Sequence, residues 1–148
     1  FYYYYLVMSN NEHEILLEAL NNGNNESIMN TSKAEIQKMK NDIMQQLYLP
    51  REMLKDFHKR LKKYRYCDEM PDLISGQFIR WISIKDPENI TLSRGAFYCD
   101  TEIKANGLYV ICRSGRGNVF QIKFDECIFF QKLSYQEELI LKVIDYLK

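Results

Sequence analysis

A short basic run is the part of the sequence best suited to binding chemistry. Five cations and no acid occupy it: Lys59, Arg60, Lys62, Lys63 and Arg65. Lysine and arginine neutralise phosphate groups, and aromatic rings can stack on exposed bases. Tyr64, Tyr66 and Trp81 are rings that lie close to this run in the sequence. The combination predicts a non-specific nucleic-acid interface.

A helix end accounts for the same basic run without any ligand. An apolar stripe predicts a helix that begins at Pro50 and ends in the run: Met53, Leu54, Phe57 and Leu61. Cations near the C-terminus of a helix interact favourably with its dipole. Residues 51–66 hold seven lysines or arginines and two acids, although the whole chain has a formal charge of zero. The positive charge is therefore local, and both interpretations stay open.

The strand expected directly after this region predicts a second candidate surface. Residues 77–81, "QFIRW", alternate in character, so Arg80 and Trp81 point to opposite faces. If Trp81 packs with Ile79 in the core, Arg80 lies outside beside Phe78. Mixed patches of aromatic rings and arginine dominate the energetics of protein interfaces. Phe78, Arg80 and Trp81 are therefore candidates for contacting a protein, whereas an exposed Trp81 favours base stacking.

Residue types that perform catalysis or hold metals are sparse. The cysteines include no C-x-x-C pair: Cys67, Cys99, Cys112 and Cys127. The only histidines, His13 and His58, share no metal-binding pattern. "SGRG" at 114–117 is typical of a hairpin turn rather than a phosphate-binding loop. We therefore expect no catalytic residue, no metal, no cofactor and no small-molecule substrate.

Helical periodicity dominates the N-terminal third of the chain and its C-terminus. Residues 12–20 and 32–48 predict amphipathic helices separated by a loop, and the basic helix follows from Pro50. Residues 134–147 begin with the capping box "SYQE" and predict a closing amphipathic helix. These helices flank the region that must carry the candidate binding residues.

From Gly76 onward the apolar pattern changes to alternation. Five short strands are predicted between this glycine and the closing helix, with a tight hairpin at the Asn106-Gly107 pair. Gly95 predicts a bulge or bend in the second strand. Short strands joined by close turns are typical of a small antiparallel barrel. The expected fold is therefore α+β, with an SH3-like or OB-like five-stranded barrel.

The predicted organisation has two parts. Residues 1–50 form an N-terminal helical segment, and residues 51–148 contain the basic helix, the barrel and the closing helix. Met8 and Ser9 resemble a translation start, so residues 1–7 are either upstream or artefactual, or else an edge strand. The apolar opening is too short to cross a bilayer and lacks the basic flank of a signal peptide. We expect no membrane partner, reduced cysteines and an intracellular protein.

Three stretches carry a resemblance to known proteins. "YRYCDEMPDLISGQFIRWISI", "LSRGAFYCD" and "CIFFQKL", followed by a terminal amphipathic helix, resemble a group of small uncharacterised proteins of large DNA viruses of protists. The resemblance covers residues 55–148. It implies a viral origin, with a location in the host cytoplasm or the virion, and it assigns no activity and no site residue.

Two functions from different classes are expected for this chain. The first is a non-catalytic protein-interaction or structural module of a larger assembly, which binds a protein partner or a second copy. The alternative is non-specific binding of RNA or DNA through the basic run and the aromatic residues of the barrel. A composition with 46% apolar and 14% aromatic residues excludes a wholly disordered chain.

Overall fold

The computed structural model describes residues 8–147, which form two compact units. Unit 1 combines the described residues up to Ile43 with those from Leu133 onward, and unit 2 spans Met44–Lys132. This division differs from the predicted one in two ways. The first boundary follows Ile43 and not residue 50, and the closing helix groups with the N-terminal helices and not with the strands. The two interpretations of residues 1–7 lie outside the described residues.

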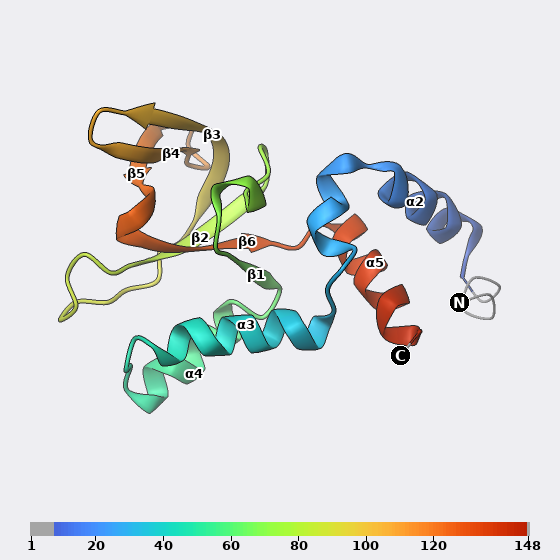
Figure 1. The fold of residues 1–148 in the computed structure, drawn as a ribbon, viewed down its shortest axis with the longest axis horizontal. Coiled ribbons are helices and arrows are strands. Elements are labelled where there is room, and N and C mark those ends of the chain that lie inside the picture. Colours follow the sequence, from blue (N-terminus) through green and yellow to red (C-terminus); the bar gives the residue numbers. More distant parts are fainter. Residues whose placement is uncertain (1–7, 148) are drawn as a thin grey trace. The chain divides into compact units, whose positions relative to one another are not determined.

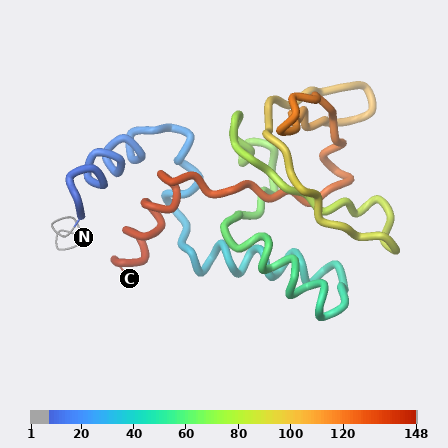
Figure 2. Tube along the Cα trace, turned by 180° about the vertical axis from the view of Figure 1, so that it is seen from behind, coloured from blue at the N-terminus to red at the C-terminus, as the bar shows by residue number. Residues whose placement is uncertain are grey.

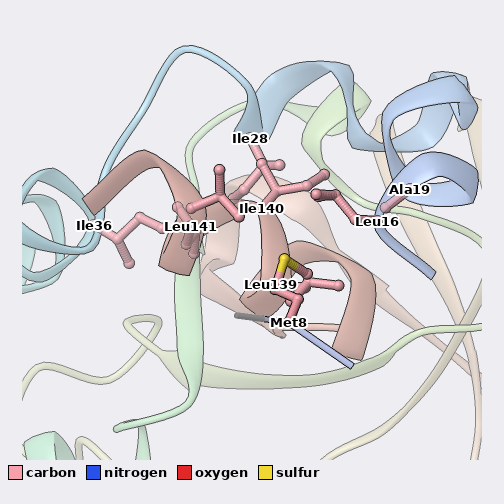
Figure 3. Close-up of a cluster of buried hydrophobic side chains, with 9 residues drawn as sticks. Met8, Leu16, Ala19, Ile28, Ile36, Leu139, Ile140 and Leu141 are labelled. Atoms are coloured by element: carbon pink, nitrogen blue, oxygen red, sulfur yellow. The ribbon is translucent and has the colours of Figure 1, made fainter. Parts of the chain in front are cut away.

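Unit 1 is built from helices that share one apolar core. Its elements are α2 (Asn10–Asn21), the 3₁₀ helix η1 (Gly23–Ile28), most of α3 (Lys33–Gln45) and α5 (Tyr135–Tyr146). Capping boxes start α2 at Ser9 and α5 at Ser134, which confirms the predicted start of the closing helix. Figure 3 shows how side chains of these elements meet in the core together with Met8, which precedes α2: Leu16, Ala19, Ile28, Ile36, Leu139, Ile140 and Leu141.

The sequence predicts a loop at the Asn-rich segment, whereas the structure has a helical turn there. Asn25 is buried, and its side-chain amide donates hydrogen bonds to the carbonyl oxygen of Ala19 (2.9 Å) and to Oε1 of Gln136 (3.1 Å). Asn22 donates to the same Oε1 at 3.0 Å. Asparagine amides thus join α2 and η1 to α5, a contact that the turn propensity of asparagine does not reveal.

Unit 2 contains one complete α-helix, two short 3₁₀ helices and an antiparallel sheet whose strands differ in length. Its elements are α4 (Arg51–Arg60), β1 (Tyr64–Cys67), η2 (Met70–Asp72), β2 (Phe78–Ser83), β3 (Ala96–Lys104), β4 (Gly107–Arg113), β5 (Val119–Lys123), η3 (Phe124–Glu126) and β6 (Cys127–Lys132). The strand order is β1-β6-β2-β3-β4-β5, and Figure 1 shows β6 running between β1 and β2. Figure 2 shows the yellow-green loop between β2 and β3 projecting from the sheet.

The α+β class is confirmed, but the sheet has six strands rather than five and is not closed. The additional strand is β1, which begins inside the basic run that the sequence analysis assigned to a helix end. It pairs with β6, and β2 occupies the other side of β6. Both edges of β6 are therefore paired with a strand. Among the described residues, β5 pairs only with β4. A closed barrel is not confirmed, because β5 remains an edge strand.

One face of the curled sheet packs into a core to which every strand contributes. Its buried members are Cys67, Leu73, Ile79, Ala96, Tyr98, Val110, Cys112 and Phe129, with Trp81, Ile122 and Phe124 partly buried against them. The register of β3 with β4 shifts between Tyr98 and Asp100, so the strand has an irregularity, but not at Gly95, where the sequence predicts it. Gly95 precedes β3 with φ of +100°.

Candidate functional site

The basic run lies where α4 ends and turns into β1. Lys59, Lys62 and Lys63 are exposed there. Arg60 is also exposed, but its Nε donates a hydrogen bond to Oδ2 of Asp56 at 2.9 Å. Three solvent-exposed lysines thus lie at a helix end, an arrangement that fits both the helix-dipole and the phosphate interpretations.

Arg65, which the sequence analysis places in the nucleic-acid site, does not lie on this exposed surface. Only 6% of the residue is exposed. Its guanidinium donates to the carbonyl oxygen of Asp72 (2.8 Å) and to Sγ of Cys67 (3.4 Å). Arg65 lies in β1 opposite Gln131 of β6, so the strand directs it onto the buried side of the sheet. A buried guanidinium bonded to protein groups holds β1 against η2 rather than binding phosphate.

The tyrosines beside the basic run are also unsuited to stacking on bases. Burial raises the pKa of the Tyr64 phenol, and the nearby Arg80 guanidinium partly opposes this shift. The Tyr66 ring packs against Phe130 with 5.9 Å between centroids. Its hydroxyl donates to Oδ1 of Asp68 at 3.0 Å, and burial together with this carboxylate raises its pKa to about 12. Both rings are therefore engaged inside unit 2.

Arg80 and Trp81 lie on opposite faces of β2, as strand parity predicts, and both are half-buried. Nε of Arg80 donates to the carbonyl oxygen of Ser93 (2.9 Å), and Nη1 donates to that of Arg60 (3.5 Å). The end of α4 therefore lies on the Arg80 face. Trp81 packs with Phe129 on the other face, so the sheet separates it from Lys59, Lys62 and Lys63.

A row of side chains that the sequence analysis missed runs across four strands on the Phe78 face. Register pairs Phe78 with Phe97, Phe97 with Arg113, and Arg113 with Val119. Directly opposed residues of paired strands share a face, so these four side chains form one line, here named the Phe–Arg row. Phe97 is 38% exposed, Val119 is 67% exposed and Arg113 is also exposed. Only the cross-strand register reveals this row.

Gly95 brings Phe78 close to the backbone at the start of β3. A Cβ placed on Gly95 would lie 2.4 Å from Cε2 of Phe78 and 2.7 Å from the carbonyl oxygen of Ile79. The Phe78 ring therefore lies over the glycine and meets Phe97 edge to face, with 5.2 Å between centroids. The close approach fixes one end of the Phe–Arg row.

An open hollow of about 510 Å³ lies elsewhere in unit 2, at the end of β2. It is bounded by β2, the β3–β4 turn, the edge strand β5 and η3, and Trp81 lines it together with Lys85, Lys123 and Glu126. We call it the Trp81 hollow. Cys127 also lines it, and burial raises the pKa of this thiol to about 11, with Glu126 adding to the shift. The thiol is therefore protonated at neutral pH and is a poor nucleophile.

The described part of the chain gives no sign of a metal centre or a membrane span. No group of three histidine, cysteine, aspartate or glutamate side chains that could hold an ion occurs among residues 8–147. No helix in that range is long and apolar enough to cross a membrane.

Comparison with known proteins finds no matching family model, no similar curated protein and no similar solved structure. The resemblance to viral proteins therefore stays a prediction.

Proposed function

We propose that the chain is a non-catalytic protein-binding module whose partner contacts the Phe–Arg row. The observation that carries this proposal is the alignment of Phe78, Phe97, Arg113 and Val119 across four neighbouring strands. This surface replaces the predicted set of Phe78, Arg80 and Trp81. Of that set only Phe78 lies in the row, and Arg80 donates to backbone carbonyls beside it.

The chemistry of the row matches that of interface centres. Aromatic side chains and arginine are enriched in the buried centre of protein interfaces, where they supply most of the binding energy. Arg113 lies between an exposed phenylalanine and an exposed valine, so its charge has apolar neighbours on both sides. Exposed apolar groups on a rigid sheet lose little conformational entropy when a partner covers them. We propose that this partner is a component of a larger assembly.

We further infer that the curled sheet acts as an SH3-like small barrel with one seam left open. A core shared by all six strands supports this inference, since such packing requires a strongly coiled sheet. The open seam lies between the two terminal strands, β1 and β5, and the free edge of β5 is available in addition to the Phe–Arg row. A partner that adds a strand there would extend contacts made by Val119.

The row is tested by replacing Phe97 and Val119 together with serine. We expect affinity for the partner, or for a second copy of the chain, to fall at least tenfold, about 1.4 kcal/mol or more. Sedimentation velocity measures self-association, and quantitative cross-linking mass spectrometry compares the proteins captured by the wild type and the variant. Thermal unfolding confirms that the variant is folded.

Ile103→Ser is the matched control for this experiment. Ile103 is 84% exposed and pairs with Leu108 on the opposite face of the same sheet. Its replacement should leave partner binding unchanged, because it lies outside the row. A wild-type chain that is monomeric and captures no protein contradicts the proposal. So does a partner that is retained equally by both variants.

A further inference from the structure

The Trp81 hollow is separate from both surfaces described so far. None of the four side chains of the Phe–Arg row lines the hollow, although Lys123 lies on the same face of β5 as Val119. The lysines at the end of α4 lie on the Arg80 face, opposite to Trp81. Any ligand of the hollow therefore binds independently of the basic run.

Trp81 presents a partly exposed ring that its neighbours hold in place. The ring packs against Phe120 with 5.9 Å between centroids and against Phe129 with 6.5 Å, at tilts of 55° and 45°. Two contacts on the core side fix the orientation of the indole, while its remaining surface lines the hollow. A rigid, partly exposed indole is a suitable platform for stacking a planar ring.

The charged groups around the indole favour an anion. Lys85 and Lys123 both line the hollow, against one acid, Glu126. Nζ of Lys85 is 4.0 Å from Oε2 of Glu126, and both side chains are substantially exposed, so this pair neutralises the lysine only weakly. A Cβ on Gly107 would lie 3.0 Å from Cε of Lys123, so the lysine side chain rests against the turn. The Lys85 side chain is therefore largely exposed, whereas that of Lys123 rests against the turn.

Polar groups complete the lining of the hollow. Asn106 from the β3–β4 turn contributes a side-chain amide that can both donate and accept hydrogen bonds. Gln121 from β5 contributes amide N–H donors, because its Oε1 already accepts a hydrogen bond from Nζ of Lys104. Amides of this kind read the edges of a planar heterocycle, in addition to the stacking that the ring provides. A volume of about 510 Å³ falls within the range of small-molecule sites.

We propose that the Trp81 hollow binds one nucleotide of a single-stranded nucleic acid, with the base stacked on Trp81 and the phosphates contacted by Lys85 and Lys123. A base in a duplex is stacked on both sides and cannot reach the indole, so a single strand is the appropriate form. A cationic ligand would meet two lysines, which makes an aromatic cage for methylated amines unsuitable.

The chain contains one tryptophan, and this gives the experiment a probe inside the site. Stacking of a base on Trp81 should quench its fluorescence. We expect oligonucleotides of about ten deoxythymidines or uridines, lengths that single-strand binding folds accommodate, to quench the emission at micromolar concentration and low salt. The logarithm of the affinity should fall linearly with the logarithm of the salt concentration. The matched duplex should bind more weakly.

Replacing Lys85 and Lys123 together with glutamine should weaken the affinity for the oligonucleotide, measured by quenching, about tenfold or more. The slope of log affinity against log salt concentration should become shallower by an amount that corresponds to about two phosphate contacts. The triple variant Lys59→Gln, Lys62→Gln and Lys63→Gln is the matched control and should bind as the wild type does. Circular dichroism confirms that both variants fold. Serine at Phe97 and Val119 should also leave quenching unchanged, so failure of the proposed protein interface and failure of this inference are distinguishable.

Several results would overturn the assignment. One is the absence of quenching at low salt, and another is equal loss of binding in the Lys59, Lys62 and Lys63 variant. If uridine or thymidine monophosphate binds as tightly as the oligonucleotide, a free nucleotide is the ligand and the single-strand proposal is wrong. Preference for uridine over deoxythymidine, or the reverse, identifies which nucleic acid is bound.

Discussion

Gly95→Ala is expected to lower the free energy of unfolding by about 3 kcal/mol, the sum of an unfavourable positive φ and a steric overlap. The residue has φ of +100°, and the added Cβ would lie 2.7 Å from the carbonyl oxygen of Ile79. Phe78 can turn its ring away, but Ile79 is fixed by pairing with strands on both sides. The backbone itself would have to move. Urea unfolding followed by Trp81 fluorescence measures the loss in unit 2.

Two other glycines separate the causes of this destabilisation. Gly117 has φ of +92° with nothing within 4 Å of a built Cβ, so Gly117→Ala tests the backbone conformation alone. Gly115 has open space and no positive φ, and Gly115→Ala should change the stability least. The expected order of destabilisation is Gly95, then Gly117, then Gly115. Equal losses at Gly95 and Gly117 would show that the contact with Ile79 contributes nothing.

Phe129→Ala is expected to cost about 4 kcal/mol of unfolding free energy, because it removes a large ring from a fully buried site. Phe129 is 0% exposed and lies in β6, which has strands on both sides. Its ring stacks on Phe124 with 5.5 Å between centroids and also contacts Trp81. The change leaves a cavity where β6 meets η3. Urea unfolding and the near-ultraviolet circular dichroism of the aromatic rings measure its effect.

Phe120→Ala supplies the comparison, since Phe120 also contacts Trp81 but is 36% exposed on the edge strand. Phe120→Ala should lower the free energy of unfolding by less than half as much as Phe129→Ala does. If Phe129→Ala fails to fold, Phe129→Leu fills most of the cavity and should still be destabilised, by about 1 kcal/mol. A loss at Phe129 no larger than that at Phe120 would refute the central position of this ring in the core.

Local signals explain which elements could be predicted from the sequence. The capping box at Ser134 and the apolar stripe behind it act within one helix, so residue spacing alone reveals α5. Strands β2 to β6 are short apolar runs separated by turn residues, although β6 is buried at four consecutive positions and does not alternate. The first strand, β1, has only four residues and directly follows a basic helix end, so it shows no alternation that can be recognised. Its partner β6 lies near the other end of unit 2 in the sequence.

The candidate sites depend more strongly on distant contacts. Arg65 looks exposed in the sequence because charged residues are rarely buried, and its burial requires the carbonyl oxygen of Asp72 to accept its hydrogen bond. The Phe–Arg row exists only through the register of β2, β3, β4 and β5. Parity correctly placed Arg80 and Trp81 on opposite faces, but it could not show that α4 lies on the Arg80 side.

The composition of unit 1 from two separated segments sets an order of events during synthesis. Helices α2 and α3 leave the ribosome first, yet the helix that covers their apolar residues, α5, is made only after all of unit 2. Unit 2 is continuous, so it can fold while α5 is still being translated. Until then Leu16, Ile28 and Ile36 lack their partners on α5, and the nascent chain exposes the surface that chaperones recognise.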